Sequence, residues 1–176
     1  KCGVVLWRDK AKTHHSIGVD DDGSLWAPSL GEETRRRDFA DGKFKMDAIV
    51  RVDPITGREL ERFQLIDVFD RSDRLGIPRV GLSAARMDII HTNDVEPLPA
   101  KMAGAFPMFA AGDLLVSSRN LNLLYVIDRK TRKIKWTFVG PTQGQHDPDF
   151  NADGTITVLD NLGRSHNAAS RILSID

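Results

Sequence analysis

Three of the five histidines stand at the head of similar stretches of sequence. His15 precedes Gly23 by eight residues, and His146 precedes Gly154 by the same interval. Each of these glycines closes an Asp- or Asn-rich turn that leads into an apolar run, and His91 heads a third stretch of this kind. Because the chain has only five histidines, chance placement of three at equivalent positions is improbable. We therefore expect the three to share a role.

The residue types favour transfer or binding of an anionic group. A neutral imidazole is a competent nucleophile near neutral pH. Arg119 follows an apolar run, and strand alternation predicts a partly buried position for it, where a guanidinium needs an anion or a carboxylate as partner. We expect either an ion pair with a carboxylate such as Asp160 or a clamp on two oxygens of a sulfuryl or phosphoryl group.

Each histidine also has a purely structural interpretation. His91 precedes Thr92 and Asn93 and could hydrogen-bond a turn, whereas His146 precedes an Asp-Pro pair and could cap a strand. His166 falls between two expected strands, so we predict that it lies in a surface loop.

Strands are the elements that must position these side chains. Short runs of Val, Ile, Leu and Trp recur between Asp-Gly, Thr-Gly and Asn-rich turns, and no long stretch keeps a helical apolar period. Residues 48–63 have the pattern of a hairpin, residues 123–138 repeat it, and a third copy begins at residue 171. The predicted class is all-β with little helix.

Aligned on their histidines, the copies define three units, at residues 14–66, 91–140 and 146–176. Four strands in roughly 40 to 50 residues favour a β-propeller blade over part of a sandwich, since a sandwich has no reason to repeat a histidine at the head of each sheet. We predict a partial β-propeller of about three four-stranded antiparallel blades, with residues 4–7 as an outer strand of a preceding blade. Further blades or a partner chain would close the ring.

The repeat is interrupted by charged inserts at residues 31–47 and 67–88, which we predict to be solvated loops that could cover a site. In a propeller the first strand of each blade lines the central channel. His15, His91 and His146 are then expected on the innermost strands, with their imidazoles directed toward one axis.

Composition excludes several classes. The 25 basic and 25 acidic residues leave no net charge, which argues against a dedicated nucleic-acid binder, and the compact basic run at residues 35–37 is predicted to be a solvated loop. No stretch approaches the ~20 apolar residues of a membrane span. The lone Cys2 excludes an internal disulfide framework and a cysteine-rich metal site.

Four segments together carry a family resemblance. Residues 88–94, residues 114–119, and residues 144–147 leading into residues 153–161 resemble the bacterial aryl-sulfate sulfotransferases. The resemblance implies a β-propeller enzyme that moves a sulfuryl group from a phenolic sulfate ester to a phenol without a nucleotide sulfate donor. It further implies aryl sulfates and phenols as small-molecule partners and a periplasmic or extracellular location. Independently of the resemblance, capture of the sulfuryl group on an imidazole would divide the transfer into two displacements, which predicts ping-pong kinetics and requires no metal or organic cofactor.

The resemblance also implies residue roles. His146 corresponds to the histidine that is transiently sulfated. His91, Arg119 and a histidine of the His14–His15 pair correspond to groups that bind the sulfuryl oxygens.

Two other interpretations stay open. Three converging histidines could form an open zinc site of a metal-assisted hydrolase, although a fixed cation such as Arg119 close to a divalent metal is unfavourable without a bridging anion. The chain could instead be a non-catalytic propeller that serves as a binding or scaffold module.

Overall fold

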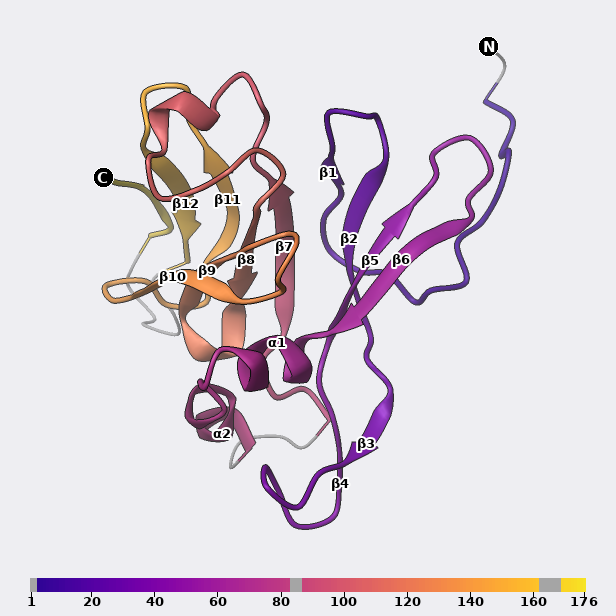
Figure 1. Ribbon diagram of the computed structural model, residues 1–176. Coiled ribbons are helices and arrows are strands. Elements are labelled where there is room, and N and C mark those ends of the chain that lie inside the picture. The colour runs from indigo at the N-terminus through magenta and orange to yellow at the C-terminus, as the bar shows by residue number, and fades with distance from the viewer. Residues whose placement is uncertain (1–2, 83–86, 162–168) are drawn as a thin grey trace.

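The computed structural model describes residues 3–82, 87–161 and 169–176, and antiparallel strands form most of its regular structure (Figure 1). The first sheet has the order β1-β2-β5-β6, with strands Gly18–Val19, Leu25–Ser29, Ala48–Val52 and Glu59–Gln64. The second has the order β10-β9-β8-β7, with β7 to β10 at Thr92–Pro97, Leu114–Ser118, Leu123–Ile127 and Ile134–Val139. The third has the order β11-β12-β13, at His146–Phe150, Ile156–Asp160 and Arg171–Ile175. The all-β prediction is confirmed.

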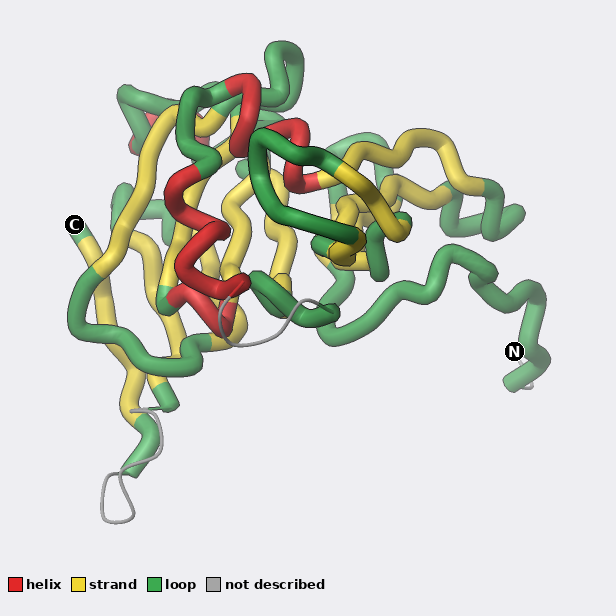
Figure 2. Tube along the Cα trace, turned by 90° about the horizontal axis from the view of Figure 1, so that it is seen from below, coloured by secondary structure: helices red, strands yellow, loops and turns green. Residues whose placement is uncertain are grey.

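Helix is minor, as expected. The described residues contain two α-helices and two 3₁₀ turns, namely α1 Leu65–Arg71, α2 Gly76–Leu82, η1 Ala103–Ala105 and η2 Arg119–Leu121, and Figure 2 shows the helical segments in red. Among the helices of the described residues, none has both the length and the apolar character needed to cross a membrane.

The first strands of the three sheets lie close together. β7 packs against β1 and β2 of the first sheet and against β11 of the third sheet (Figure 1). Within each sheet the strands follow one another in chain order, so the first strand is an edge strand in each case. The described part of the chain forms no closed ring of sheets, and the propeller stays a prediction.

The repeated hairpin turns have the same hydrogen bonds. Asp53 Oδ1 accepts the backbone N–H groups two and three residues further on, and Asp128 Oδ1 does the same in the second sheet. Four residues after each aspartate the backbone is left-handed, with φ of 71° at Gly57 and 57° at Arg132. The sequence repeat therefore corresponds to one turn geometry used twice.

The prediction that both charged inserts are solvated loops was wrong. Residues 31–47 form the hairpin β3 (Glu33–Arg35) and β4 (Lys43–Lys45), from which Phe44 is completely buried. α1 enters the second insert and buries Phe69 against Tyr125 of the second sheet, with the ring centroids 5.4 Å apart. Apolar side chains at helical and strand spacing, placed among the charges, drive these segments into the core.

The prediction of an outer strand at residues 4–7 was also wrong. This segment is not a strand, and Leu6 remains 81% exposed. Trp7 instead donates its indole N–H to the carbonyl oxygen of Pro54 at 2.9 Å and packs over Gly57. The segment covers the β5–β6 turn rather than extending a sheet.

A buried carboxylate joins the first and second sheets. Asp20, in the β1–β2 turn, accepts the indole N–H of the buried Trp26 at 3.0 Å and pairs with Arg129 of the β9–β10 turn at 2.7 Å. The guanidinium carbons of Arg51 and Arg129 lie 5.7 and 5.4 Å from the Trp26 ring centroid, within the range of a cation–π contact.

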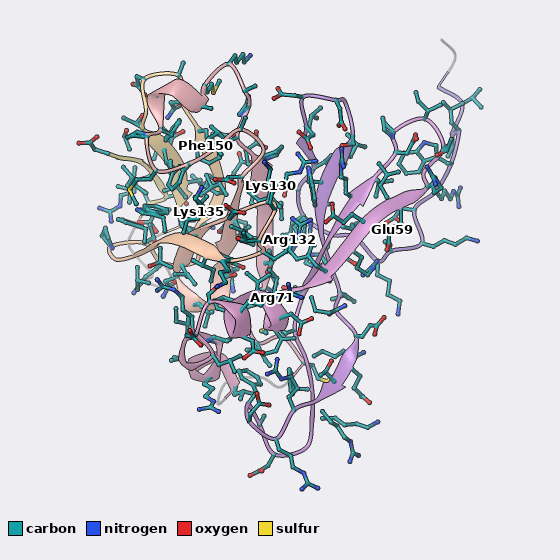
Figure 3. The ribbon with its side chains drawn as sticks, viewed as in Figure 1. Glu59, Arg71, Lys130, Arg132, Lys135 and Phe150 are labelled. Atoms are coloured by element: carbon teal, nitrogen blue, oxygen red, sulfur yellow. The ribbon has the colours of Figure 1, made fainter. Side chains whose placement is uncertain are left out.

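A second contact between these sheets lies further along the same hairpin, where Arg132 is labelled in Figure 3. Its guanidinium pairs with Glu61 of β6 and lies 4.3 Å from the Phe63 ring centroid. The two arginines of the β9–β10 turn thus hold the first sheet at a fixed position relative to the second.

We expect Asp20→Ala to lower the free energy of unfolding by about 3 kcal/mol, because it removes the buried acceptor of both Arg129 and the Trp26 indole. Urea denaturation measures this loss. Asp67→Ala is the matched control, since this exposed carboxylate on α1 lies 3.7 Å from Arg36 and is expected to contribute less than about 1 kcal/mol. Equal losses in the two variants would contradict a structural role for the buried pair.

Candidate functional site

Four histidines gather where the first strands of the sheets meet. The ring centroid of His15 lies 5.0 Å from that of His14, 4.9 Å from that of His91 and 6.2 Å from that of His146. His146 is the first residue of β11, His91 immediately precedes β7, and His15 lies three residues before β1. The sequence intervals therefore bring together side chains from all three sheets.

The backbone is in the left-handed region at each of these strand starts. The φ angles are 65° at His15, 51° at His91 and 53° at Asp147. In the third sheet the left-handed residue is thus the one after the histidine. His146 and His15 therefore differ in backbone conformation, although each lies eight residues before the glycine of its turn. Non-glycine residues with positive φ are uncommon and concentrate at functional sites.

A chain of hydrogen bonds runs through three of the rings. His91 Nδ1 lies 2.8 Å from Asp88 Oδ2, and because a carboxylate only accepts, Nδ1 carries the proton. With neutral rings, His91 Nε2 then accepts from His15 Nε2 at 3.3 Å, and His15 Nδ1 accepts from His14 Nδ1 at 2.8 Å. His14 Nε2 ends the chain, buried and 4.0 Å from Asp47 Oδ1.

The surroundings of this chain disfavour positive charge on its inner members. Burial lowers the pKa of His14 below its usual value, and the nearby His91 lowers it further. Burial also lowers the pKa of His15, and the charges of the other three histidines add to the effect. Beside His14, burial raises the pKa of Asp47, which accepts the backbone N–H of Thr92. His14 and His15 are therefore neutral at pH 7 in the free protein.

His146 is held by a different set of contacts. Its Nδ1 lies 2.9 Å from the carbonyl oxygen of Gly144 and 2.9 Å from Asn161 Nδ2. The completely buried Gln145 donates to Ser117 Oγ at 3.1 Å and thereby anchors the preceding backbone to β8 of the second sheet. Among the described residues these contacts are made to Nδ1 of His146, so Nε2 is the ring nitrogen that could react.

Arg119 lies beside this group, although not on the strand predicted for it. β8 ends at Ser118, and Arg119 begins η2, which is closed by the bond from the backbone N–H of Asn122 to the carbonyl oxygen of Arg119 at 3.2 Å. The backbone N–H of Arg119 donates to the carbonyl oxygen of His91 at 2.9 Å. Its guanidinium donates to Asn120 Oδ1 at 3.2 Å, and its Nε lies 3.9 Å from where a Cβ on Gly144 would stand. Asp160, the carboxylate considered for it, pairs with Arg171 at 2.9 Å. Arg119 is thus adjacent to both the His91 and the His146 segments.

An open cleft of about 470 Å³ adjoins the cluster, a size suited to a small organic ligand. Its lining contains Lys12, Thr13, His14, His15, Leu30, Asp47, Met87, Asp88 and His91. Leu30 and Met87 supply exposed apolar surface at its wall. His146 and Arg119 are not among the residues that line this cleft, although the ring centroid of His146 lies 6.2 Å from that of His15, which does.

Carboxylates follow the histidines along the same two strands. Burial raises the pKa of Asp94 to about 7, and the neighbouring Asp147 and Asp149 add to the effect. Burial also raises the pKa of Glu96 to about 7, and the charges of Asp94, Asp149 and Asp147 add to the effect. Because Asp94 and Glu96 are partly protonated near neutral pH, the strands that follow the histidines carry less negative charge than their sequence indicates.

Several participants could not be recognised from the sequence. Asp88, Asp47 and Asn161 each lie beside a histidine of the cluster, but only the three-residue interval from Asp88 to His91 could have indicated such a contact. His166, predicted at the surface, lies outside the described residues. Within the part of the chain that the structure describes, no group of three or more His, Cys, Asp or Glu side chains has an arrangement that could hold a metal ion.

Comparison with known proteins agrees with the resemblance seen in the sequence. The model of the arylsulfotransferase (ASST) family matches residues 6–176. This range contains the four clustered histidines and Arg119. A search of curated proteins found no match.

Proposed function

The chain belongs to the arylsulfotransferase (ASST) family, and from this premise we propose that it transfers a sulfuryl group from an aryl sulfate to a phenol through a sulfated His146. The observation that carries the proposal is the cluster itself. Four imidazoles gather where the first strands of the three sheets meet, and Arg119 lies beside the His91 and Gly144 backbone, so that hydrogen-bond donors could surround one anion. Such preorganised donors stabilise the charge that develops during group transfer.

In the first step the lone pair of His146 Nε2 attacks sulfur, the N–S bond forms, and the bond from sulfur to the aryl oxygen breaks. The departing phenolate takes a proton from the His15–His91 pair, which must carry one positive charge at that moment. Asp88 orients the His91 ring, because its carboxylate accepts the Nδ1–H of His91 at 2.8 Å. Arg119 holds the sulfuryl oxygens with its planar fork.

In the second step a phenol enters, its oxygen attacks the sulfur, and the N–S bond breaks. The phenol proton returns to the His15–His91 pair, and His146 regains its lone pair. One site thus serves both half-reactions, which predicts ping-pong kinetics. The apolar wall formed by Leu30 and Met87 provides a surface for the aryl ring while the sulfuryl end extends past His15.

Anion binding is expected to be coupled to proton uptake. The pKa of His15 is lowered in the free protein, whereas a bound sulfate would favour the charged imidazole and raise that pKa. Affinity for inorganic sulfate should therefore rise as the pH falls from about 7.5 through the ordinary histidine pKa of about 6.5. Calorimetry in buffers of different ionisation enthalpy should detect the proton that is taken up.

His15→Gln keeps a polar side chain that cannot take up a proton, and it should remove most of the uptake. Sulfate binding that does not depend on pH in the unmodified protein would contradict a role for the histidines in binding the anion.

The function is tested by mixing the protein with nitrophenyl sulfate and a phenol, with and without a chelator. Transfer that resists the chelator supports the proposal. Hydrolysis that the chelator abolishes would favour the metal-dependent hydrolase instead. Absence of both reactions would favour a non-catalytic binding module.

A further inference from the structure

Asn161 lies opposite the segment that holds the reactive histidine. In the third sheet His146 of β11 pairs with Leu159 of β12 in antiparallel register. Continued two residues outward from that pair, the same register brings Gly144 opposite Asn161. The sheet itself therefore places the Asn161 amide beside the backbone that precedes His146.

Three polar atoms meet at this point. Asn161 Nδ2 donates to the carbonyl oxygen of Gly144 at 2.9 Å, His146 Nδ1 lies 2.9 Å from the same oxygen, and the two nitrogens are also 2.9 Å apart. Ser170 Oγ donates to Asn161 Oδ1 at 3.3 Å, which directs the amide nitrogen, rather than the amide oxygen, toward Gly144. Asn122 Oδ1 accepts the Gly144 N–H at 2.9 Å and holds the preceding peptide group of the same residue.

These contacts favour one tautomer of the ring. A proton on His146 Nδ1 can be donated to the Gly144 oxygen, which has a second lone pair for Asn161. If Nδ1 carried no proton, it could accept the second N–H of Asn161 at 2.9 Å, but its lone pair would face that of the Gly144 carbonyl oxygen at the same distance. The repulsion in this second arrangement favours the first.

We propose that Asn161 is a positioning residue, which holds the Gly144 carbonyl oxygen against His146 Nδ1 and so keeps Nε2 unprotonated and free to attack sulfur. The catalytic consequence rests on the proposed function. The predicted tautomer does not rest on the proposed function, because it is a property of the free protein without substrate. Partners of the non-reacting nitrogen commonly fix ring orientation and tautomer in this way.

The tautomer is measured by ¹H–¹⁵N correlation spectra of the histidine rings in the free protein, with the His146 resonances assigned through His146→Asn. The expected state has its proton on Nδ1. In Asn161→Ala the two tautomers should become mixed. In Asn161→Asp a carboxylate replaces the amide beside Nδ1–H, so the His146 resonances should titrate at higher pH than in the unmodified protein.

Kinetics supply a second readout. Asn161→Ala should lower kcat by ~10–100-fold with little change in KM for the aryl sulfate. Asn161→Asp, which keeps the shape of the side chain, should move the acid limb of the pH–rate profile to higher pH. A purely structural role would not move that limb.

Asn151→Asp is the matched control. Asn151 precedes the turn between β11 and β12, and its amide donates to Thr155 Oγ1 at 3.1 Å, away from the histidines. This variant should leave both the tautomer and the pH profile unchanged. An Nε2-protonated His146 in the unmodified protein, or identical behaviour of Asn161→Asp and Asn151→Asp, would overturn the proposal. If His146 has the expected tautomer but the protein has no transferase activity, the proposed function is overturned and the positioning role of Asn161 is not.

Discussion

Replacing His146 by alanine should reduce sulfuryl transfer to the uncatalysed rate. His146 is proposed to form the covalent bond to sulfur, and no other member of the cluster combines a nitrogen held by a backbone carbonyl with a second nitrogen left for attack. Loss of a nucleophile removes the reaction path, whereas loss of a stabilising donor only raises a barrier.

The measurement is the rate of phenol release from an aryl sulfate in the presence of an acceptor phenol. His146→Asn is the companion variant, because its amide can keep polar contacts without acting as a nucleophile. Activity near that of the unmodified protein in His146→Asn would mean that another residue carries the sulfuryl group.

Arg119→Ala should lower kcat by ~10²–10³-fold, the usual loss when one charge-stabilising donor is removed from an active site. The reaction path remains, so activity should be reduced and not abolished. The kcat of Arg119→Lys should lie between those of Arg119→Ala and the unmodified protein, since an ammonium keeps the charge but cannot hold two oxygens in one plane. Steady-state kinetics with a nitrophenyl sulfate donor give the comparison.

Arg37→Ala is the control for this series, because Arg37 is an exposed arginine of the insert at residues 31–47. It should leave kcat unchanged. Equal kcat values for Arg119→Ala and the unmodified protein would remove Arg119 from the proposed site.

The fold was predictable to the extent that it depends on local repeats. The turns at Asp53 and Asp128 use the same side-chain acceptor and the same left-handed position, so their similarity is visible in the residues themselves. The structure of the inserts was predicted wrongly because single buried residues such as Phe44 and Phe69 decide their packing. When a segment is assessed by its overall composition, the many charged neighbours outweigh these few apolar residues.

The site was predictable to the extent that spacing to a turn fixes a position. That interval identified His15 and His146, whose ring centroids lie 6.2 Å apart. The contact between Asn161 and Gly144 could not be foreseen, since it depends on strand register in the third sheet. Arg119 was expected on a strand, but it begins a 3₁₀ turn, closed by the bond from the Asn122 N–H to the Arg119 carbonyl oxygen, that local alternation does not reveal.

The sulfated intermediate can be sought directly by mixing the protein with an aryl sulfate and no acceptor, followed by quenching and peptide mass analysis. The expected result is a sulfuryl adduct on the peptide that contains His146, labile in acid and lost when a phenol is added before quenching. An adduct confined to the peptide that contains His91, or transfer that proceeds in His146→Ala at the rate of the unmodified protein, would contradict His146 as the nucleophile.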